Sequence, residues 1–595
     1  MKNTIMIKKG TEGIWIKGVK RMLIGAAFFI LHSSFFISCI DTSVLPADKT
    51  IEEDFWKTKA DVQLMVTGAY RQMVNTDVLK RVIVWGESRS DEVVVNQDPT
   101  SEDATALKEV EAADIQPSNI FTNWAAFYSA INYCNIVLEK AGQVLLIDPS
   151  YTNEDYLTDC SQVLALRALC YFYLVRAYRD VPFTTTAYIN SSQELEIGQA
   201  APLTVINQCI ADAQEAALHP INADPTAFGD WRSVGYITED GINALLADLY
   251  LWRGSLTHSA TDYDSCAVYC QKVITSKQYY YPKNAIENPE GSDYALINGD
   301  VAFADIFVNG NSQEAVLELQ LDGENNSNTA VCNYYYMYSK SVKHGFLQVP
   351  SIFASIGNDK VYQNANDYRY WQNTYNVGDT KQTYYDVRKM STSSTKKIDP
   401  TSSPVAFNRT DEDRAYGTFA QNWIVYRLSD IILMKAEALV AQAADDNDPL
   451  LQEAFTLVAE VNTRSLAVKS EALKFSNYNS IQAMETLVLE ERQRELCFEG
   501  KRWWDLMRMN YRHITPADPT KTLAQLEEEG ATFANNHTQM LTLATRKYEE
   551  GAGIVARMRT EPTLYWPINQ SELKVNANLR QNPVYASSDL YQKNY

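Results

Sequence analysis

Apolar positions recur at helical spacing along most of the chain. Helices are therefore predicted over residues 61–73, 122–140, 162–178, 239–253, 266–274, 424–441, 451–463 and 484–508. The segment 162–178 is apolar apart from Arg167 and Arg176, which is typical of a helix buried in a core. Small residues such as Ala168, Ala244 and Ala436 alternate with Tyr and Leu, as in closely packed helix pairs. A tetratricopeptide-like stack is one such architecture, although no strict repeat of about 34 residues is present. The pattern predicts a mainly α protein.

The helical periodicity weakens over residues 276–420, where Tyr and Trp are interspersed with Asn, Gly, Ser and Asp. We interpret this stretch as a variable, aromatic-rich region of long loops and a few short strands. It separates an N-terminal helical part, residues 39–275, from a C-terminal helical block of the same domain, residues 421–510. Residues 511–595 form a loop-rich C-terminal cap in this interpretation.

The first 38 residues have the pattern of an export signal. Six basic residues and one acid precede or enter an apolar run over residues 22–37, which is shorter than the roughly 20 residues of a membrane-spanning helix. Phe36-Ile37-Ser38-Cys39 then resembles a bacterial lipobox, so Cys39 is predicted to carry lipid. The alternative is an ordinary secretory signal followed by an incidental cysteine. A lipid on Cys39 would be the membrane anchor.

Composition excludes several classes of protein. The formal net charge is −21, whereas nucleic-acid binding requires a basic face, so no nucleic-acid partner is expected. Beyond Cys39, eight cysteines remain and none forms a C-x-x-C pair, which argues against a disulfide framework and a zinc site. Neither a metal nor another cofactor is predicted. A structural Ca²⁺ at residues 445–448 stays open, but the sequence there lacks the Gly and terminal Glu of an EF-hand loop, and a solvated turn between helices is favoured.

No short catalytic motif is present: the chain lacks H-E-x-x-H, G-x-S-x-G, a P-loop and a dinucleotide fingerprint. Glu491, Glu495 and Glu499 share one helix face. Two carboxylates about 5–10 Å apart in a cleft would be needed for glycoside hydrolysis, and a structural ion-pair network is the favoured interpretation. Trp503 and Trp504 are interpreted as core residues. Arg167 is expected to hold a structural partner inside the fold.

A series of short motifs occurs in a fixed order behind the lipobox. They are Glu53-Asp54-Phe55-Trp56, Trp85-Gly86-Glu87-Ser88-Arg89-Ser90-Asp91, Leu166-Arg167-Ala168, Arg179-Asp180-Val181-Pro182, Tyr426-Arg427-Leu428-Ser429-Asp430, Phe498-Glu499-Gly500-Lys501-Arg502-Trp503-Trp504-Asp505 and Gln581-Asn582-Pro583. This ordered set resembles the SusD/RagB family of outer-membrane lipoproteins from Bacteroidota. Arg179 and Val584 depart from it, because Gly is usual at both positions.

The resemblance implies a SusD-like α-helical fold in which tetratricopeptide-like helix pairs support a loop-rich variable part. It implies a location in the outer membrane, lipid-anchored and facing the cell exterior. The expected partner is a TonB-dependent transporter of the SusC/RagA type, which receives captured oligosaccharides for nutrient uptake. Capture of peptides, as in RagB-type members, is the alternative, and a secreted glycoside hydrolase or a scaffold that binds only proteins is less favoured. The family implies binding without catalysis.

Candidate ligand-binding residues come from the aromatic-rich region. Sugar rings pack on aromatic faces, while their hydroxyl groups bond to amide and charged side chains. That mixture occurs at Asn333, Tyr334, Tyr335, Tyr336, Asp367, Arg369, Tyr370 and Trp371. A peptide would use the same aromatic residues together with backbone hydrogen bonds.

Overall fold

The computed structural model describes residues 55–586, except residues 191, 229, 283–291, 337–343, 378–384, 402–418, 534–535 and 549–550. The predicted signal segment 1–38 and the predicted lipid site Cys39 lie outside the described residues. The compact unit that begins at Trp56 contains the helices, strands and core described below.

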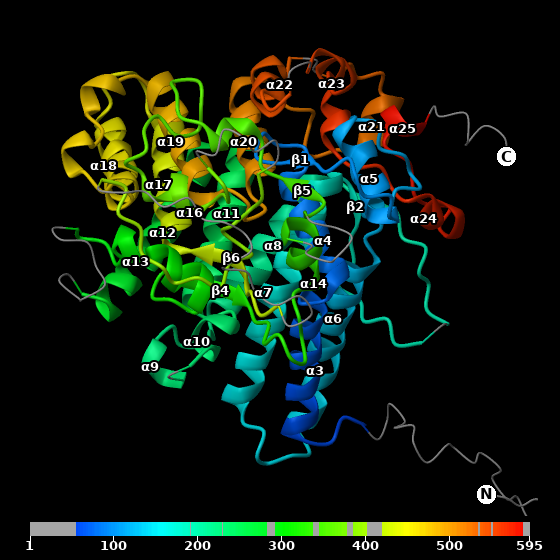
Figure 1. The fold of residues 1–595 in the computed structure, drawn as a ribbon. Coiled ribbons are helices and arrows are strands. Elements are labelled where there is room, and N and C mark those ends of the chain that lie inside the picture. The colour runs from blue at the N-terminus through cyan, green and yellow to red at the C-terminus, as the bar shows by residue number, and fades with distance from the viewer. Residues whose placement is uncertain are drawn as a thin grey trace, which may run out of the picture. The chain divides into compact units, whose positions relative to one another are not determined.

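Long helices make up the first half of this unit. They are α3 (Lys59–Met73), α4 (Thr76–Glu87), α5 (Glu102–Glu111), α6 (Ala125–Leu145), α7 (Asn153–Tyr178), α8 (Pro202–Ala216), α11 (Glu239–Thr257) and α12 (Ala260–Tyr280), with the short helices η1 (Ile120–Thr122), α9 (Pro225–Phe228) and α10 (Arg232–Gly235) between them. Successive helices pack as pairs: α6 on α7, α7 on α8 and α11 on α12 (Figure 1). Capping boxes at Thr58 and Thr152 fix the starts of α3 and α7, because each threonine side chain satisfies an otherwise unpaired backbone N–H.

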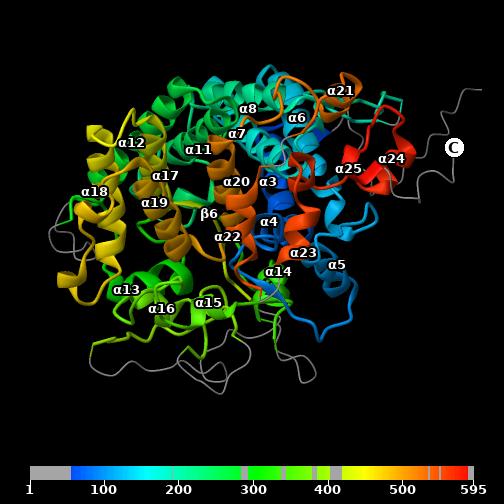
Figure 2. The same cartoon turned by 90° about the horizontal axis from the view of Figure 1, so that it is seen from above.

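The second half combines a loop-rich region, a helical block and a cap. The loop-rich region contains α13 (Gly299–Phe303), η2 (Ala304–Asn309), α14 (Thr329–Val331), η3 (Cys332–Tyr336), α15 (Ser351–Ala354) and α16 (Tyr368–Gln372). The block contains α17 (Leu428–Gln442), α18 (Pro449–Arg464), η5 (Lys469–Glu471), η6 (Phe475–Asn477), α19 (Ile481–Leu496) and α20 (Arg502–His513). The cap contains α21 (Leu523–Glu528), α22 (Thr538–Thr545), α23 (Ala552–Arg557), η7 (Glu561–Leu564), α24 (Gln570–Val575) and α25 (Pro583–Ala586). Figure 2 shows α13, α15 and α16 along one edge of the α17–α19 helices.

Three short antiparallel strand pairs occur in the described residues. They are β1 (Val94–Val95) with β5 (Leu347–Gln348), β2 (Val181–Pro182) with β3 (Gln199–Ala200), and β4 (Ala315–Leu319) with β6 (Trp423–Arg427). Two of them, β1–β5 and β4–β6, connect different parts. In the last pair Leu319 lies opposite Trp423, and Arg427 opposite Ala315. This pair joins the loop-rich region to α17. The mainly α prediction is confirmed.

Two predicted helices need correction. The predicted helix 424–441 begins as strand β6 and becomes helical at Leu428, because the backbone of residues 423–427 pairs with β4. The predicted helix 484–508 is broken into α19 and α20 around Phe498 and Gly500, whose φ angles are 67° and 75°. A Cβ on Gly86 of α4 would lie 2.0 Å from the carbonyl oxygen of Gly500, so the break lets α4 approach this turn closely.

Arg179 shows why Gly is usual at its position in the family pattern. It caps α7 with φ 66°, in the left-handed region that side chains with a Cβ seldom adopt. Its guanidinium is held by Asp180 at 2.7 Å and by the carbonyl oxygens of Lys521 and Asp518 at 2.9 Å each. These bonds tie the cap region to the end of α7 and offset the backbone strain.

A buried ion-pair network is centred on Glu495 of α19. Arg369, Arg427 and Arg464 reach its carboxylate at 2.9, 2.6 and 2.5 Å. Although burial alone would raise it, these three guanidinium groups hold the pKa of Glu495 well below its usual range. The three arginines come from α16, the end of β6 and the end of α18, so one carboxylate joins three separate segments.

Glu491 and Glu499 extend the network, as predicted for this helix face. Arg369 also bonds to Glu491 at 2.8 Å, while Arg427 and Lys389 reach Glu499 at 2.8 and 2.7 Å. The ion-pair interpretation is therefore confirmed, and most of the partners come from outside α19.

Other core predictions are also confirmed. Arg167 forms a bidentate ion pair with Asp212, with N–O distances of 2.7 and 2.9 Å. Trp503 and Trp504 are buried. Residues 445–448 form the turn between α17 and α18, where the Asp448 side chain accepts a hydrogen bond from the N–H of Leu450. The eight cysteines in the described part are free thiols.

We expect Glu495→Gln to lower the free energy of unfolding by about 3–5 kcal/mol, because it leaves three arginines buried around a neutral amide. Denaturant unfolding followed by circular dichroism measures this change. Glu490→Gln is the matched control on the same helix: its side chain is 43% exposed and lies 3.7 Å from Arg494. The control should lose less than about 1 kcal/mol. Equal losses in the two variants would show that the network does not hold the fold.

Candidate functional site

A cavity of about 550 Å³ opens between the end of α3, the α10 segment and the end of β4. Its aromatic side is formed by Trp231, Tyr236 and Tyr70. The Trp231 and Tyr236 ring centroids are 5.9 Å apart, and those of Tyr236 and Tyr70 are 5.7 Å apart with the rings edge to face. Trp231 is 46% exposed although it is a large apolar ring. The three rings form a continuous apolar wall.

Local contacts hold this wall in place. The Tyr70 hydroxyl donates to Gln162 and accepts the N–H of Ile237 at 2.9 Å, so the pocket faces its ring rather than its polar end. Gly235 follows Trp231 by one helical turn, and a Cβ there would lie 2.8 Å from both the Trp231 ring and the Gln320 side chain. The glycine therefore leaves room for the ring to lie against the backbone.

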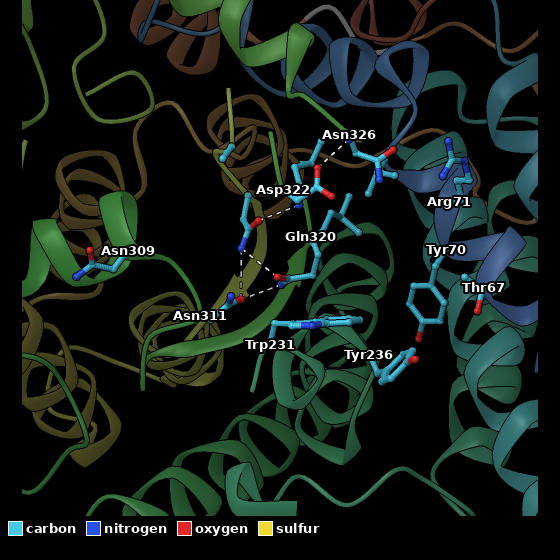
Figure 3. Close-up of a pocket in the computed structure, with 16 residues that line it drawn as sticks. Thr67, Tyr70, Arg71, Trp231, Tyr236, Asn309, Asn311, Gln320, Asp322 and Asn326 are labelled. Atoms are coloured by element: carbon cyan, nitrogen blue, oxygen red, sulfur yellow. Dashed lines mark hydrogen bonds between the residues drawn. The ribbon is translucent and has the colours of Figure 1, made fainter. Parts of the chain in front are cut away.

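Amide side chains form another part of the cavity wall, next to the Trp231 ring. Gln320 donates to the Asn311 carbonyl oxygen at 2.8 Å, and Asn422 donates to Glu318 at 2.9 Å and to Gln320 at 3.2 Å. Figure 3 shows the Trp231 ring edge-on below the side chains of Gln320 and Asn311. These amides come from the turn before β4, from the end of β4 and from the residue before β6. Their mutual hydrogen bonds fix donors and acceptors at the cavity before any ligand arrives.

Two charged residues line this cavity in the part of the chain that the structure describes. Asp322 accepts the backbone N–H groups of Asn326, Glu324 and Asn325 at 2.8–3.0 Å. The Asn326 bond and its neighbours lower the pKa of Asp322 to about 2. Arg71, in the last turn of α3, is exposed and has no hydrogen-bond or ion-pair partner among the described residues. The site therefore offers one fixed carboxylate and one available guanidinium.

The structure places the sequence-predicted binding residues elsewhere. Tyr334, Tyr335, Tyr336, Tyr370 and Trp371 are all buried. Tyr334 donates to Asp103 at 3.0 Å, and the Trp371 indole donates to the carbonyl of Ala365 at 2.8 Å. These contacts give the rings a role in the core, and their contact with ligand stays a prediction.

Asp367 and Arg369 lie together within the ion-pair network, with Nη2 and Oδ2 2.7 Å apart. Asn333 is partly exposed and its carbonyl accepts the N–H of Phe346 at 3.1 Å. Five of the eight predicted residues are thus buried aromatic residues, two belong to the charge network and Asn333 belongs to neither group, while the cavity is lined by other residues. One sequence feature could have indicated the cavity. Trp231 is a large aromatic residue among polar residues, between the predicted helices 162–178 and 239–253.

Outside the cavity, Glu87 and Glu92 form a buried pair of carboxyl groups whose pKa values are both raised. Glu92 accepts the N–H of Phe498 at 3.0 Å and Glu87 accepts the N–H of Gly500, so the pair holds the turn between α19 and α20. Burial raises the pKa of Glu92 to about 7, and burial beside Glu92 raises the pKa of Glu87 well above its usual value. Glycosidases use pairs of carboxyl groups that face an open cleft. Glu87 and Glu92 are 0% and 1% exposed, so the pair does not face such a cleft. The pair fixes a strained turn.

The described residues contain neither a metal-binding cluster nor a helix suited to crossing a membrane. No group of three or more His, Cys, Asp or Glu side chains there is arranged to hold a metal ion. Within the same residues, no helix combines the length and apolar character required to cross a bilayer.

The structure is a mainly α-helical fold with an open cavity lined by aromatic and amide side chains. Two protein-family models match the sequence. Residues 269–585 match a model described as "SusD family", and residues 46–220 match one described as "Starch-binding associating with outer membrane". The chain belongs to the SusD family, which confirms the resemblance found in its motifs.

Individual relatives agree with this assignment. The chain is 24% identical over 511 residues to SusD-like protein P38 of Formosa agariphila, covering 82% of this chain and 91% of that one. The crystal structure of a SusD superfamily protein from Bacteroides thetaiotaomicron has a TM-score of 0.61 at 19% identity, covering 89% of this chain and 99% of that chain. Surface glycan-binding protein A from Bacteroides thetaiotaomicron, in complex with laminarihexaose, has a TM-score of 0.57 at 16% identity and covers 88% and 100%. The two structures show that the fold is shared.

Glu92→Gln is expected to change how stability depends on pH. Because the folded-state pKa of Glu92 lies above its unfolded value, the folded chain binds more protons near neutral pH, and its stability falls as pH rises from about 4.5 through about 7. The amide cannot ionise, so the variant lacks this proton-linked loss of stability. The variant should therefore lose less stability than the parent chain between pH 5 and pH 8, by up to about 3 kcal/mol. Urea unfolding at several pH values in this range measures the two stabilities. If the free energy of unfolding changed equally with pH in the variant and the parent chain, the raised pKa of Glu92 would be contradicted.

Proposed function

We propose that this chain is a lipid-anchored protein of the outer-membrane surface that binds oligosaccharides in the 550 Å³ cavity. The observation that carries the proposal is the exposed Trp231 ring beside amide side chains that hydrogen bonds already hold in position. A pyranose ring presents a face of C–H groups that packs on a flat aromatic ring. Its hydroxyl groups both donate and accept, as do the side-chain amides of Asn311, Gln320 and Asn422. The volume lies within the range of about 300–1,000 Å³ typical of ligand sites.

The proposed role is binding without catalysis. Among the described residues that line the cavity, Asp322 is the one carboxylate, and it stays ionised down to a pH of about 2. Glycoside hydrolysis by the common mechanisms requires a second carboxyl group, and one of the pair must be protonated to act as the acid. The described residues of the cavity wall supply neither a second carboxyl group nor a protonated one.

Delivery to a SusC-like TonB-dependent transporter completes the proposal. It is supported by membership of the SusD family and by the lipobox-like sequence that ends at Cys39. A lipid at Cys39 would keep the protein at the outer membrane, where a transporter of that type would receive the captured glycan.

Peptide binding is the second candidate, and one observation favours it. The unpartnered Arg71 guanidinium at the cavity could hold the carboxylate of a peptide, since such charge-assisted bonds are strong and directional. A carboxylate-bearing sugar would satisfy the same group.

Trp231→Ala should weaken oligosaccharide binding roughly thirtyfold, because truncating a central aromatic residue in a binding site costs about 2 kcal/mol. Isothermal titration against laminarihexaose, starch oligosaccharides and a peptide panel measures the effect. Tyr279→Ala is the matched control, since Tyr279 is a 78% exposed ring on α12 that does not line the cavity. The control should bind as the parent chain does. Peptide binding that depends on Arg71, with no response to any glycan, would replace the glycan proposal with the peptide one.

A further inference from the structure

Exposed aliphatic side chains gather at the end of the bundle where the chain enters α3. Leu146 and Ile147, on the turn between α6 and α7, are 85% and 56% exposed. Leu64, in the second turn of α3, is 61% exposed. We call Leu146 and Ile147 the α6–α7 tip. Figure 1 shows this turn beside the start of α3 at the lower end of the drawing.

The tip is held rigidly. Asp148, which follows Ile147, accepts the backbone N–H of Lys59 at 2.8 Å and the N–H of Ser150 at 2.9 Å. The Lys59 ammonium group pairs with Asp155 at the start of α7, also at 2.8 Å. The turn is thereby clamped to the first residues of α3. Its two aliphatic side chains are presented to solvent by an ordered backbone, and the charges of Asp148, Lys59 and Asp155 are used in internal bonds.

The segment that links the predicted lipid site Cys39 to the folded unit enters the unit at this same end. The predicted lipid site Cys39 precedes Phe55 by 16 residues, which span at most about 55 Å even when fully extended. A lipid on Cys39 would therefore keep the start of α3, and the tip bonded to it, close to the bilayer.

We infer that the α6–α7 tip is a second membrane contact, in which Leu146 and Ile147 insert into the outer leaflet. The inference rests on the lipid anchor of the proposed function. A lipid surface fits the tip better than a protein partner does, because two side chains on a convex turn offer far less than the roughly 800 Å² that a stable protein interface buries on each side. Shallow insertion requires only the side chains themselves, and a lipid anchor combined with a second contact holds a protein much better than either alone. The contact would fix the orientation of the chain on the membrane.

A fluorescent probe at position 147 tests the inference. The lipidated Ile147→Cys chain, in a Cys160→Ser background, is labelled and placed on vesicles of phosphatidylethanolamine and phosphatidylglycerol that contain a spin-labelled lipid. Val268→Cys is the matched control, since Val268 is also 56% exposed and lies on α12, which packs against α11 and α17 rather than α3. We expect the lipid to quench the probe at position 147 and not the probe at position 268.

Leu146→Asp should reduce the quenching at position 147, whereas Leu195→Asp, at a residue that is 58% exposed on another segment, should leave it unchanged. Equal quenching at positions 147 and 268, no quenching at 147, or protection of 147 only after a barrel transporter is added would each overturn the inference. These outcomes leave the anchor itself intact. Mass spectrometry that shows no lipid on Cys39 would instead contradict the anchor of the proposed function and, with it, this inference.

Discussion

The arrangement of this protein depends on the neutralisation of charges inside its core. Glu495 is surrounded by three arginines from three different segments, and each would be costly to bury alone. Arg427, one of the three, is also the last residue of β6, whose partner strand β4 leads directly into the cavity wall at Gln320. The same ion pairs that hold the loop-rich region against α19 thus fix the strand pair that positions the amides of the cavity wall.

Internal contacts hold both the aromatic and the amide side chains of the cavity wall in position. Gly235 and the bonds of the Tyr70 hydroxyl let three rings form a wall without exposing the polar end of Tyr70. Asn311, Gln320 and Asn422 hold one another through hydrogen bonds. A ligand that meets groups already in position loses less entropy on binding than one that must order them. This preorganisation supports the proposed binding of an oligosaccharide without catalysis.

The perturbed carboxyl groups of the chain serve its structure. Glu495 has a lowered pKa because arginines surround it, while Glu92 has a raised pKa because burial dominates. Both hold segments near the break between α19 and α20, where Phe498 and Gly500 adopt left-handed backbone angles. A perturbed pKa can mark a functional site, yet here neither group lines the open cavity.

Local patterns in the sequence determined most of the long helices, though not α4, α5 or α8, together with the buried positions of Arg167 and Trp503, and the family. Helical periodicity, composition and ordered motifs are properties of neighbouring residues, so they can be recognised without coordinates. The cavity wall could not be recognised in this way, because Tyr70, Trp231 and Gln320 come from separate segments that only packing brings together. For the same reason the tyrosines at 334–336 suggested a binding surface, although the fold buries them. Composition shows which side chains can contact a sugar, whereas tertiary packing decides which of them stay exposed.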